Sequence, residues 1–370
     1  MKKVNSGPSL YHVSDKAISD GLEKVSKIQM IHFLRRKGIF VSESIEKDEL
    51  IKYIRTFNFS YSDYLWITKQ LENPNKRIRT EVAKIDLEIE TDELKQIANK
   101  VKSSLSSEDI NCRVIKNDNT IKLELNYLEE DLSVSELKQK QPIKTEIELT
   151  NNNGSIGIRY GSLQDVKKVK DILIDKIKEE TNNADLEPIE ISLQFLTSPE
   201  VRSEFFMELS KAIEGYKFDD ILSVDVTKDF NFNIDDDDDD DDDEKDDIKE
   251  RHIAAIRSAA LKGVSVTSTP HFTQLHNDGY YIYKIVWSSI HDILEGKKVI
   301  FEAQFGNKVK CNNFKYLVKY IYDVAKRKNA IGLHTKRHRE ISDLERKNLN
   351  SKLEKAALDT YASIVEKYGV

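Results

Sequence analysis

The sequence predicts an α+β protein with a small N-terminal helical module, a two-layer α/β sandwich in the middle and a C-terminal α+β domain with two closing helices. Two observations predict this class. The hydrophobic pattern changes from helical spacing to alternation near residue 78, and a run of aspartates interrupts the chain near residue 235. With 370 residues, the chain is long enough for two or three domains. We expect domains at 1–75, 78–230 and 248–370, and an acidic linker at 231–247.

The first 75 residues predict a small group of helices. Hydrophobic residues recur at helical spacing over residues 22–34, and Gly38 ends this stretch. Ser44 is a suitable N-cap for a second helix, whose hydrophobic residues at 50–54 share one face. A third helix is expected at 61–71, before turn residues that mark the end of the module.

Residues 22–57 contain two helical segments joined by a short link. The first ends in Phe33-Leu34-Arg35-Arg36-Lys37-Gly38-Ile39, the link passes through Ser42 and Ser44, and the second carries Leu50-Ile51-Lys52-Tyr53-Ile54. This pattern resembles the SAP and LEM families of small helix–extended-loop–helix modules. Members of these families commonly bind DNA or DNA-associated proteins. The resemblance implies docking through the cations of this segment: Arg35, Arg36, Lys37, Lys47 and Lys52.

Acidic residues of the same segment leave the partner open. Glu43, Glu46 and Asp48 lie in the link and the first turn of the second helix, where phosphate binding would need cations or bare backbone N–H groups. Three interpretations therefore stand: a nucleic-acid contact, a protein-docking module, and a helical cap with no binding role.

Residues 78–230 predict the two-layer sandwich. Apolar and charged residues alternate over 83–90, 121–126 and 144–149, as in strands with one buried and one solvated face. The turn Asn151-Asn152-Asn153-Gly154 joins the last of these to residues 156–158 in a hairpin. Amphipathic helices are expected beside the strands, at 92–105, 163–180 and 199–213.

The charged sides of these strands carry carboxylates at alternate positions, which point to one side of a sheet. They are Asp86, Glu88, Glu90, Glu124, Glu146 and Glu148. A metal-dependent nuclease needs such converging carboxylates. The other interpretation is an ordinary solvated face, on which the acids pair across strands with the interleaved lysines. Those lysines are Lys84, Lys122 and Lys144.

The segment Asp235 to Asp247 carries a net charge of −11, because nine consecutive aspartates are followed by three more acids and one lysine. Such a run cannot bury apolar surface, so we expect a solvated linker. It either keeps the neighbouring domains apart or folds back onto a basic surface and competes with an acidic ligand. The sequence leaves both roles open.

Residues 248–370 predict the closing α+β domain, which opens with a helix at 248–261. Strands are expected at 264–267, 272–275, 280–287 and 298–305, with a hairpin turn at Asn277-Asp278-Gly279. The first of two closing helices begins after Asn312 or Asn313 and presents one apolar face. That face carries Phe314, Leu317, Val318, Ile321 and Ala325.

This domain is basic between Lys308 and Lys355, where fourteen lysines and arginines face five acidic residues. Because phosphate backbones attract clustered cations, the segment is a candidate nucleic-acid contact. The residues expected to make it are Lys315, Lys319, Lys326, Arg327, Lys328, Lys336, Arg337 and Arg339.

Three further patterns in this domain have two interpretations each. His334 and His338 would share a helix face, either as metal ligands or as surface histidines among cations that disfavour a metal. Aromatic residues at 280–287 either stack unpaired bases or fill the core. Glu302-Ala303-Gln304 either resembles the acidic end of some restriction-type nuclease sites, with Gln where Lys is more usual, or is a three-residue coincidence without a partner Asp.

Several classes of protein do not fit the sequence. Apolar runs are too short to span a bilayer, and residues 1–16 lack the apolar core of a signal peptide, so we expect a cytoplasmic protein. Cys112 and Cys311 are too isolated for a disulfide framework or a zinc site. Phosphate-cradling and hydrolase motifs are absent, so we expect neither a cofactor nor a metal.

The sequence favours a non-enzymatic binding or scaffold protein that contacts nucleic acid or a protein partner. Frequent Lys, Asn and Ile indicate an AT-rich genome, for which an accessory protein of a phage-defence or mobile-element system is a reasonable hypothesis. The alternative is a metal-dependent nuclease or nuclease subunit that uses the strand carboxylates. The sequence leaves the oligomeric state open.

Overall fold

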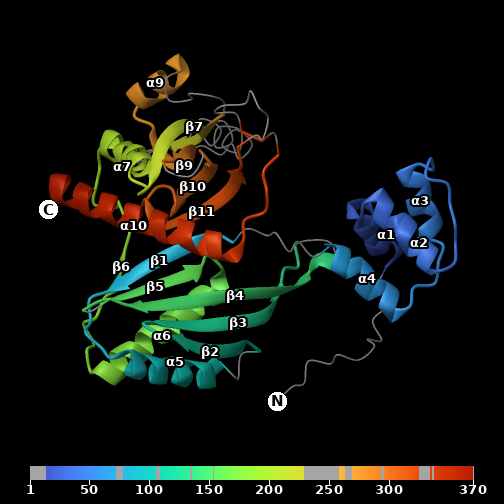
Figure 1. The fold of residues 1–370 in the computed structure, drawn as a ribbon, viewed down its shortest axis with the longest axis horizontal. Helices are drawn as coiled ribbons and strands as arrows, with labels where there is room; N and C mark the ends of the chain where they lie inside the picture. The colour runs from blue at the N-terminus through green and yellow to red at the C-terminus, as the bar shows by residue number, and fades with distance from the viewer. Residues whose placement is uncertain are drawn as a thin grey trace, which may run out of the picture. The chain divides into compact units, whose positions relative to one another are not determined.

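The computed structural model (Figure 1) divides into two compact units. Unit 1 comprises residues up to 76 with 95–116 and 121–146, and unit 2 comprises 77–94, 117–120 and 147–370. Within them the structure describes residues 14–71, 78–105, 109–133, 136–152, 154–228, 258–262, 269–292, 296–324, 334–335 and 337–369. The expected linker 231–247, the expected boundaries beside residues 75 and 248, and the expected strand 264–267 lie outside the described residues.

The N-terminal part of unit 1 is helical. Ser14 caps the first helix by accepting the Ala17 N–H, and Ser26 forms a capping box with Gln29 at the start of the second. Ser26 thereby divides the stretch 22–34, for which one helix was predicted, into two. The helices are α1 (Asp15–Lys24), α2 (Lys27–Arg36), α3 (Lys47–Ile54) and α4 (Tyr61–Leu71). Their shared core includes Leu22, Met30, Leu34, Leu50 and Ile54.

The rest of unit 1 contains a small sheet and most of a long helix. Along the strand β3, Ile121, Leu123 and Leu125 are buried while the residues between them are partly exposed, as the alternation predicts. The strands are hydrogen-bonded in the order β2-β3-β4. The elements are α5 (Thr91–Leu105), β2 (Asn111–Asn117), β3 (Thr120–Glu130), the 3₁₀ turn Glu136–Lys138 and β4 (Lys140–Asn151).

Unit 2 is built on an antiparallel sheet with the strand order β4-β5-β1-β11-β10-β9-β7-β8, and β6 also pairs with β1. Strands from either side of residues 231–247 are direct neighbours, because β7 pairs with both β8 and β9. The strands are β1 (Thr80–Ile85), β5 (Ile156–Gly161), β6 (Ile189–Glu190), β7 (Tyr216–Thr227), β8 (Ser258–Lys262), β9 (Tyr281–His291), β10 (Lys298–Asn307) and β11 (Asn312–Tyr322).

The core of unit 2 lies between this sheet and the helices α7 and α10. Trp287, Phe301 and Tyr316 of the sheet are fully buried there, together with Phe205 and Phe206 of α7. The burial of Trp287 and Tyr281 confirms that aromatic residues of β9 fill the core. The helices of unit 2 are α6 (Gln164–Thr181), α7 (Pro199–Lys211), α9 (Pro270–Asn277) and α10 (Asp343–Tyr368). None of the helices described in either unit is long and apolar enough to cross a membrane.

The predicted α+β class is confirmed, as are several of its elements. The hairpin across residues 151–154 joins β4 to β5, in the register Ile147 to Tyr160. The helices expected at 92–105, 163–180 and 199–213 correspond to α5, α6 and α7.

Parts of the C-terminal region differ from the prediction. The first expected closing helix is the strand β11, so only α10 of the two closes the chain among the described residues. Its apolar residues fit a helical face, but they belong to a strand in which Leu317 and Tyr320 on the side opposite the core and a bulge at Lys319 interrupt the alternation. The expected strand 272–275 lies in α9, because Thr269 caps a helix there and Pro270 suits its first position. The described end of the expected helix 248–261 is the strand β8.

Candidate nucleic-acid interface

The sheet of unit 2 has one apolar face and one face that carries charges. Along β10, Val299, Phe301 and Ala303 belong to the core beneath α7 and α10, so Ile300 and Glu302 point to the opposite side. We call this opposite side of β1, β7, β9, β10 and β11 the polar face.

Four cations and two carboxylates form one connected group on the polar face. We call it the basic cluster, and its members are Arg79, Glu81, Lys167, Glu302, Lys315 and Lys319. Glu302 of β10 is 1% exposed and accepts hydrogen bonds from Nε of Arg79 at 2.8 Å and from Nζ of Lys319 at 2.7 Å. Arg79 directly precedes β1 and Lys319 lies on β11, so one buried carboxylate links three neighbouring strands.

Glu81 of β1, which is 3% exposed, is the second buried carboxylate of the cluster. It accepts a hydrogen bond from Oγ of Ser162 at 2.6 Å and forms an ion pair with Nζ of Lys167 at 2.8 Å. Nζ of Lys315 on β11 lies 3.4 Å from the same Ser162 hydroxyl. The backbone N–H of Ser162 also donates to the carbonyl of Arg79 at 2.7 Å, which joins the two halves of the cluster.

The pKa values of Glu302 and Lys315 are both lowered, which favours the charged form of the acid and disfavours the charged form of the lysine. Burial alone would raise the pKa of the Glu302 carboxyl, but the hydrogen bonds and charges of Lys319 and Arg79 outweigh burial and lower it. Burial lowers the pKa of Lys315, and the charges of Lys167 and Arg79 lower it further against the attraction of Glu81. Arg79 and Lys319 contact Glu302 and Lys167 contacts Glu81, whereas Lys315 contacts the neutral Ser162 hydroxyl. The charge of Lys315 is therefore the least compensated in the cluster.

The cluster presents its positive charge outward. The side chains of Glu81 and Glu302 are 4% and 2% exposed, whereas those of Arg79, Lys167 and Lys319 are 37%, 33% and 28% exposed. Four cations above two carboxylates leave a surplus of two positive charges. An anion that approaches from solvent would meet the cations first and would relieve their mutual repulsion.

A hollow of about 460 Å³ adjoins the basic cluster, and we call it the aromatic hollow. It is lined by Leu222, Val286, Lys298, Ile300, Lys319, Tyr320, Tyr322, His334 and Thr335. Lys319 belongs to both sites, so the two are continuous. The volume lies in the range of about 300–1,000 Å³ that is usual for small-molecule sites, and the walls combine apolar groups with a few polar ones, as such sites do.

Three β-bulges aim side chains at the aromatic hollow. The pairing of β10 with β11 skips Lys319, so Lys319 and Tyr320 both line the hollow although they are consecutive. The pairing of β7 with β9 skips Asp219 and Leu222. Leu222 lines the hollow, and Asp219 forms an ion pair with its Lys298 at 2.6 Å. Bulges that re-aim side chains are over-represented next to functional sites.

The cations predicted at 308–355 separate into four groups. Lys315 and Lys319 come together in the basic cluster, although on a strand and not on a helix. The guanidinium of Arg339 is held by Glu345 and Asp323, at 2.5 Å and 3.1 Å. Arg337 lies in the irregular segment that follows Thr335. Lys326, Arg327, Lys328 and Lys336 lie outside the described residues.

The two histidines of this region are not on a helix. His334 forms an isolated bridge with Val324, and its Nε2 lies 2.7 Å from the Gly296 carbonyl oxygen. The ring of His338 packs at 4.3 Å against Tyr320, measured between ring centroids. The expected shared helix face is therefore wrong, because the chain is extended here.

The cations predicted in the N-terminal module lie in unit 1 and differ in how they are paired. Arg35 pairs with the exposed Glu43 at 3.2 Å, and Lys37 pairs with Asp63 at 2.7 Å. Arg36 and Lys52 are exposed. Lys47 donates to the Glu23 carbonyl at 2.7 Å.

The carboxylates expected along one strand do not share a sheet face. β1 ends at Ile85, so Asp86, Glu88 and Glu90 fall in the irregular segment that leads to α5. Lys84 pairs with Asp86 at 2.7 Å. The alternation of apolar and charged residues continues past Ile85, where the chain leaves the sheet, so it overestimated the length of the strand.

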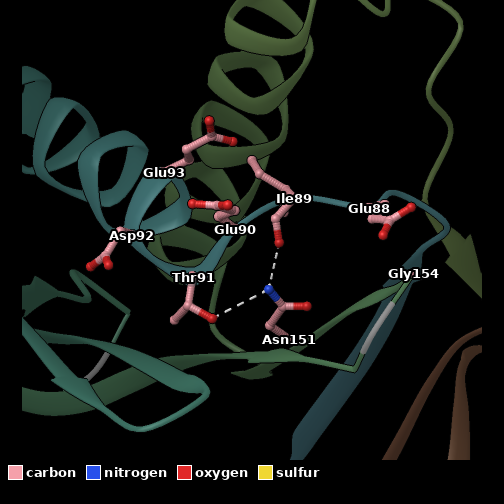
Figure 2. A pocket seen from close by; sticks show the side chains of 8 residues that line it. All are labelled: Glu88, Ile89, Glu90, Thr91, Asp92, Glu93, Asn151 and Gly154. Atoms are coloured by element: carbon pink, nitrogen blue, oxygen red, sulfur yellow. Dashed lines mark hydrogen bonds between the residues drawn. The ribbon is translucent and has the colours of Figure 1, made fainter.

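This irregular segment borders an acidic hollow of about 580 Å³ in unit 2 (Figure 2). Its acidic residues are Glu88, Glu90, Asp92 and Glu93. Figure 2 shows their carboxylates pointing in different directions, while Asn151 donates to the Ile89 carbonyl at 2.6 Å and to Oγ1 of Thr91 at 3.3 Å. No group of three or more His, Cys, Asp or Glu residues that could hold a metal ion occurs in the described part of the chain.

The remaining predicted carboxylates are partly engaged in ion pairs. In unit 1, Glu146 pairs with Lys122 across strands at 2.9 Å, as the solvated-face interpretation predicts. In unit 2, Glu148 is 5% exposed and lies 3.6 Å from Arg159 and 3.4 Å from Lys347. Glu302, singled out for its sequence Glu-Ala-Gln, is the buried anion of the basic cluster.

Sequence reasoning missed three members of the basic cluster: Arg79, Glu81 and Lys167. Arg79 and Glu81 flank the start of a strand, and Lys167 lies in the first turns of an amphipathic helix, so each reads as an ordinary surface charge. The available signal was that Glu81 and Glu302 occupy strands rich in apolar residues, where a carboxylate needs a partner.

Comparison with known proteins adds one family. Residues 21–77 match the family model described as GAPS4b protein N-terminal domain. This segment runs from the end of α1 through α4 and includes no residue of the basic cluster. No curated protein matches the chain. The crystal structure of DynU16, a putative protein in the dynemicin biosynthetic locus, matches at 9% identity and a TM-score of 0.18, over 79% of this chain and 99% of that one.

Proposed function

We propose that this chain is a nucleic-acid-binding accessory protein of a phage-defence system. The basic cluster of unit 2 contacts the sugar-phosphate backbone. The match of residues 21–77 to the GAPS4b N-terminal domain supports the phage-defence part. The observation that carries the nucleic-acid part is the surplus of cations above Glu81 and Glu302, with Lys315 least compensated.

Phosphate is the anion that suits this geometry. The cations come from β1, α6 and β11, so they form an extended surface and not a single point. Ser162 lies among them, directly before α6, and the positive end of that helix dipole adds to the attraction for an anion. Such contacts fix the position of a strand without reading its sequence.

The helical module of unit 1 supplies a second contact in this proposal. Its resemblance to SAP and LEM modules favours DNA or a DNA-associated protein as the partner, through Arg36 and Lys52. Exposed hydrophobic residues of the same module, Phe40 (82% exposed) and Tyr53 (42% exposed), would suit a protein partner as well.

The test compares a double variant of the full-length protein, Lys167→Met with Lys315→Met, with a matched control, Lys176→Met with Lys211→Met. In unit 2, Lys176 is half-buried and Lys211 is exposed, and each forms an ion pair with a glutamate three residues away on its own helix. Binding of a fluorescein-labelled duplex is measured by anisotropy across a salt series. The double variant should bind more weakly and reduce the log–log salt slope by about 1.8, at about 0.9 per phosphate.

The control should keep the wild-type affinity and slope. Equal affinities and slopes for wild type and double variant would contradict a role of the basic cluster in nucleic-acid binding. In that event a protein partner of unit 1 would be the better hypothesis.

A further inference from the structure

We infer that the aromatic hollow receives one unpaired base of a nucleic-acid strand whose phosphates lie on the basic cluster. This inference rests on the proposed function. It adds a substrate class, because a base that is stacked inside a duplex cannot enter a hollow of the protein.

The walls of the hollow suit a flat aromatic ring. Leu222, Val286 and Ile300 supply apolar surface from three neighbouring strands, and Tyr320 and Tyr322 add aromatic rings from a fourth. Bases stack on aromatic side chains without regard to sequence, because every base has a π-face. The chemistry therefore favours an unpaired base over a purely aliphatic group.

The rim of the hollow suits the polar edge of a base. The Thr335 hydroxyl donates to the Arg337 carbonyl at 2.9 Å and can still accept a hydrogen bond from a base. His334, whose Nε2 lies against the Gly296 carbonyl, and Lys298 add polar groups beside it. Lys298 is paired with Asp219, whose pKa is lowered despite its burial by hydrogen bonds from Lys298 and Ser288. The rim is thus electrically balanced, so it suits the neutral part of a nucleotide and not its phosphate.

The surplus positive charge lies in the basic cluster, which shares Lys319 with the aromatic hollow. This residue lines the hollow while its ammonium binds Glu302 of the basic cluster. The bulge at Lys319 places it and Tyr320 on the same face, so a phosphate site and an aromatic wall follow each other along β11. A single strand that crosses this point can place a base and its phosphate at once.

The test uses two labelled probes of equal charge: a thymidine dodecamer, and an abasic dodecamer with the same phosphates. The wild-type protein should bind the thymidine probe about 5- to 100-fold more tightly, as expected for one stacked base. The variant Tyr320→Leu with Tyr322→Leu should bind both probes equally, and should keep its duplex affinity. Leu222→Trp, which fills the hollow and leaves both tyrosines in place, should also remove the preference.

A spectroscopic readout identifies the occupant of the hollow. A 2-aminopurine within the thymidine probe should change its fluorescence when bound to wild type and not when bound to Leu222→Trp. Thymidine monophosphate should displace the probe only at far higher concentration, because it lacks the neighbouring phosphates. If thymidine monophosphate displaced the probe at a concentration equal to that of the probe, the base would not need to come from a strand.

The outcomes separate this inference from the function on which it rests. Equal, salt-dependent binding of both probes by wild type would overturn the unpaired base and leave the proposed function standing. Absence of binding to either probe and to duplex would overturn both, and would favour a protein side chain as the occupant of the hollow.

Discussion

Two clusters in unit 2 both combine cations with carboxylates, but they differ in net charge. The first, which we call the Arg159 cluster, consists of Glu148, Arg159, Lys347 and Glu354. Nε of Arg159 lies 2.5 Å from Glu354, and Lys347 lies 3.4 Å from Glu148. This cluster has two cations and two carboxylates, so its charges cancel. The basic cluster has four cations and two carboxylates.

The hollows beside the two clusters are almost equal in size, about 440 Å³ beside the Arg159 cluster and about 460 Å³ beside the basic cluster. The size of the adjoining hollow therefore does not distinguish the two clusters, but their charge balance does. Burial alone would lower the pKa of Arg159, yet Tyr316 and Glu354 raise it, while the pKa of Lys315 is lowered. The first cluster holds α10 on the sheet, and the second retains attraction for an anion.

The largest effect is expected from Arg159→Leu. This change leaves the half-buried Glu354 without its cation and leaves the buried Glu148 with Lys347 alone, and should lower the free energy of unfolding by about 3–5 kcal/mol. Chemical denaturation followed by circular dichroism measures it. The matched control Lys355→Met, which removes an exposed pair of α10 with Glu214, should leave the stability close to that of wild type.

Nucleic-acid binding by Arg159→Leu should equal that of wild type below its unfolding transition. A loss of affinity in this folded variant would show that the Arg159 cluster also contacts the ligand, and the distinction between the two clusters would be wrong.

Glu302→Gln should move stability and affinity in opposite directions. Arg79 and Lys319 lose their shared carboxylate, so the free energy of unfolding should fall by about 3 kcal/mol. This is the lower end of the range for buried ion pairs, because both cations reach solvent. The surplus positive charge rises from two to three, so duplex affinity should increase, most visibly at low salt. Anisotropy and denaturation of the same preparation test both, and a parallel loss of affinity and stability would contradict the assignment of Glu302 as a counter-charge.

The sequence predicted the strands with one solvated face and the well-capped helices, because their patterns are local. It failed at β11, whose Phe314, Tyr316 and Val318 face the core while Leu317 and Tyr320 are also apolar or aromatic. With apolar residues on both sides, period alone cannot separate a strand from a helix.

The candidate site was predictable only in part for a related reason. The density of positive charge in the sequence identified Lys315 and Lys319. Their neighbours in the cluster, Arg79 and Lys167, are far away in the chain. They come near only through the strand order β5-β1-β11-β10. The aromatic hollow depends on bulges at Asp219, Leu222 and Lys319, and a register shift leaves no mark in hydrophobic alternation.

Lys315→Met tests the difference between the basic cluster and the Arg159 cluster at a single residue. Because the charge of Lys315 is poorly compensated, its removal should change the free energy of unfolding by no more than about 0.5 kcal/mol. Duplex affinity should nevertheless fall, and the salt slope should decrease by about 0.9, one phosphate's share. A clear loss of stability without a change in slope would make Lys315 a structural residue like Arg159.

The smallest effect concerns the ion pair of Arg339 with Glu345, a balanced pair near the surface. The hydrogen bonds from Arg339 lower the pKa of Glu345 from 4.5 to about 2. A carboxyl whose pKa is lower in the folded state stabilises the protein above its unfolded pKa, and this contribution disappears as the pH falls from about 4.5 towards 2. Both side chains are about a third exposed, so solvent limits the contribution to about 1 kcal/mol or less. Glu345→Gln should therefore lower stability slightly at neutral pH and flatten its acid dependence. Melting temperatures of the variant and wild type that differ at pH 7 should converge near pH 2, and a constant difference over this range would show that Glu345 acts through its position as a helix-capping partner of Ser342 and not through its charge.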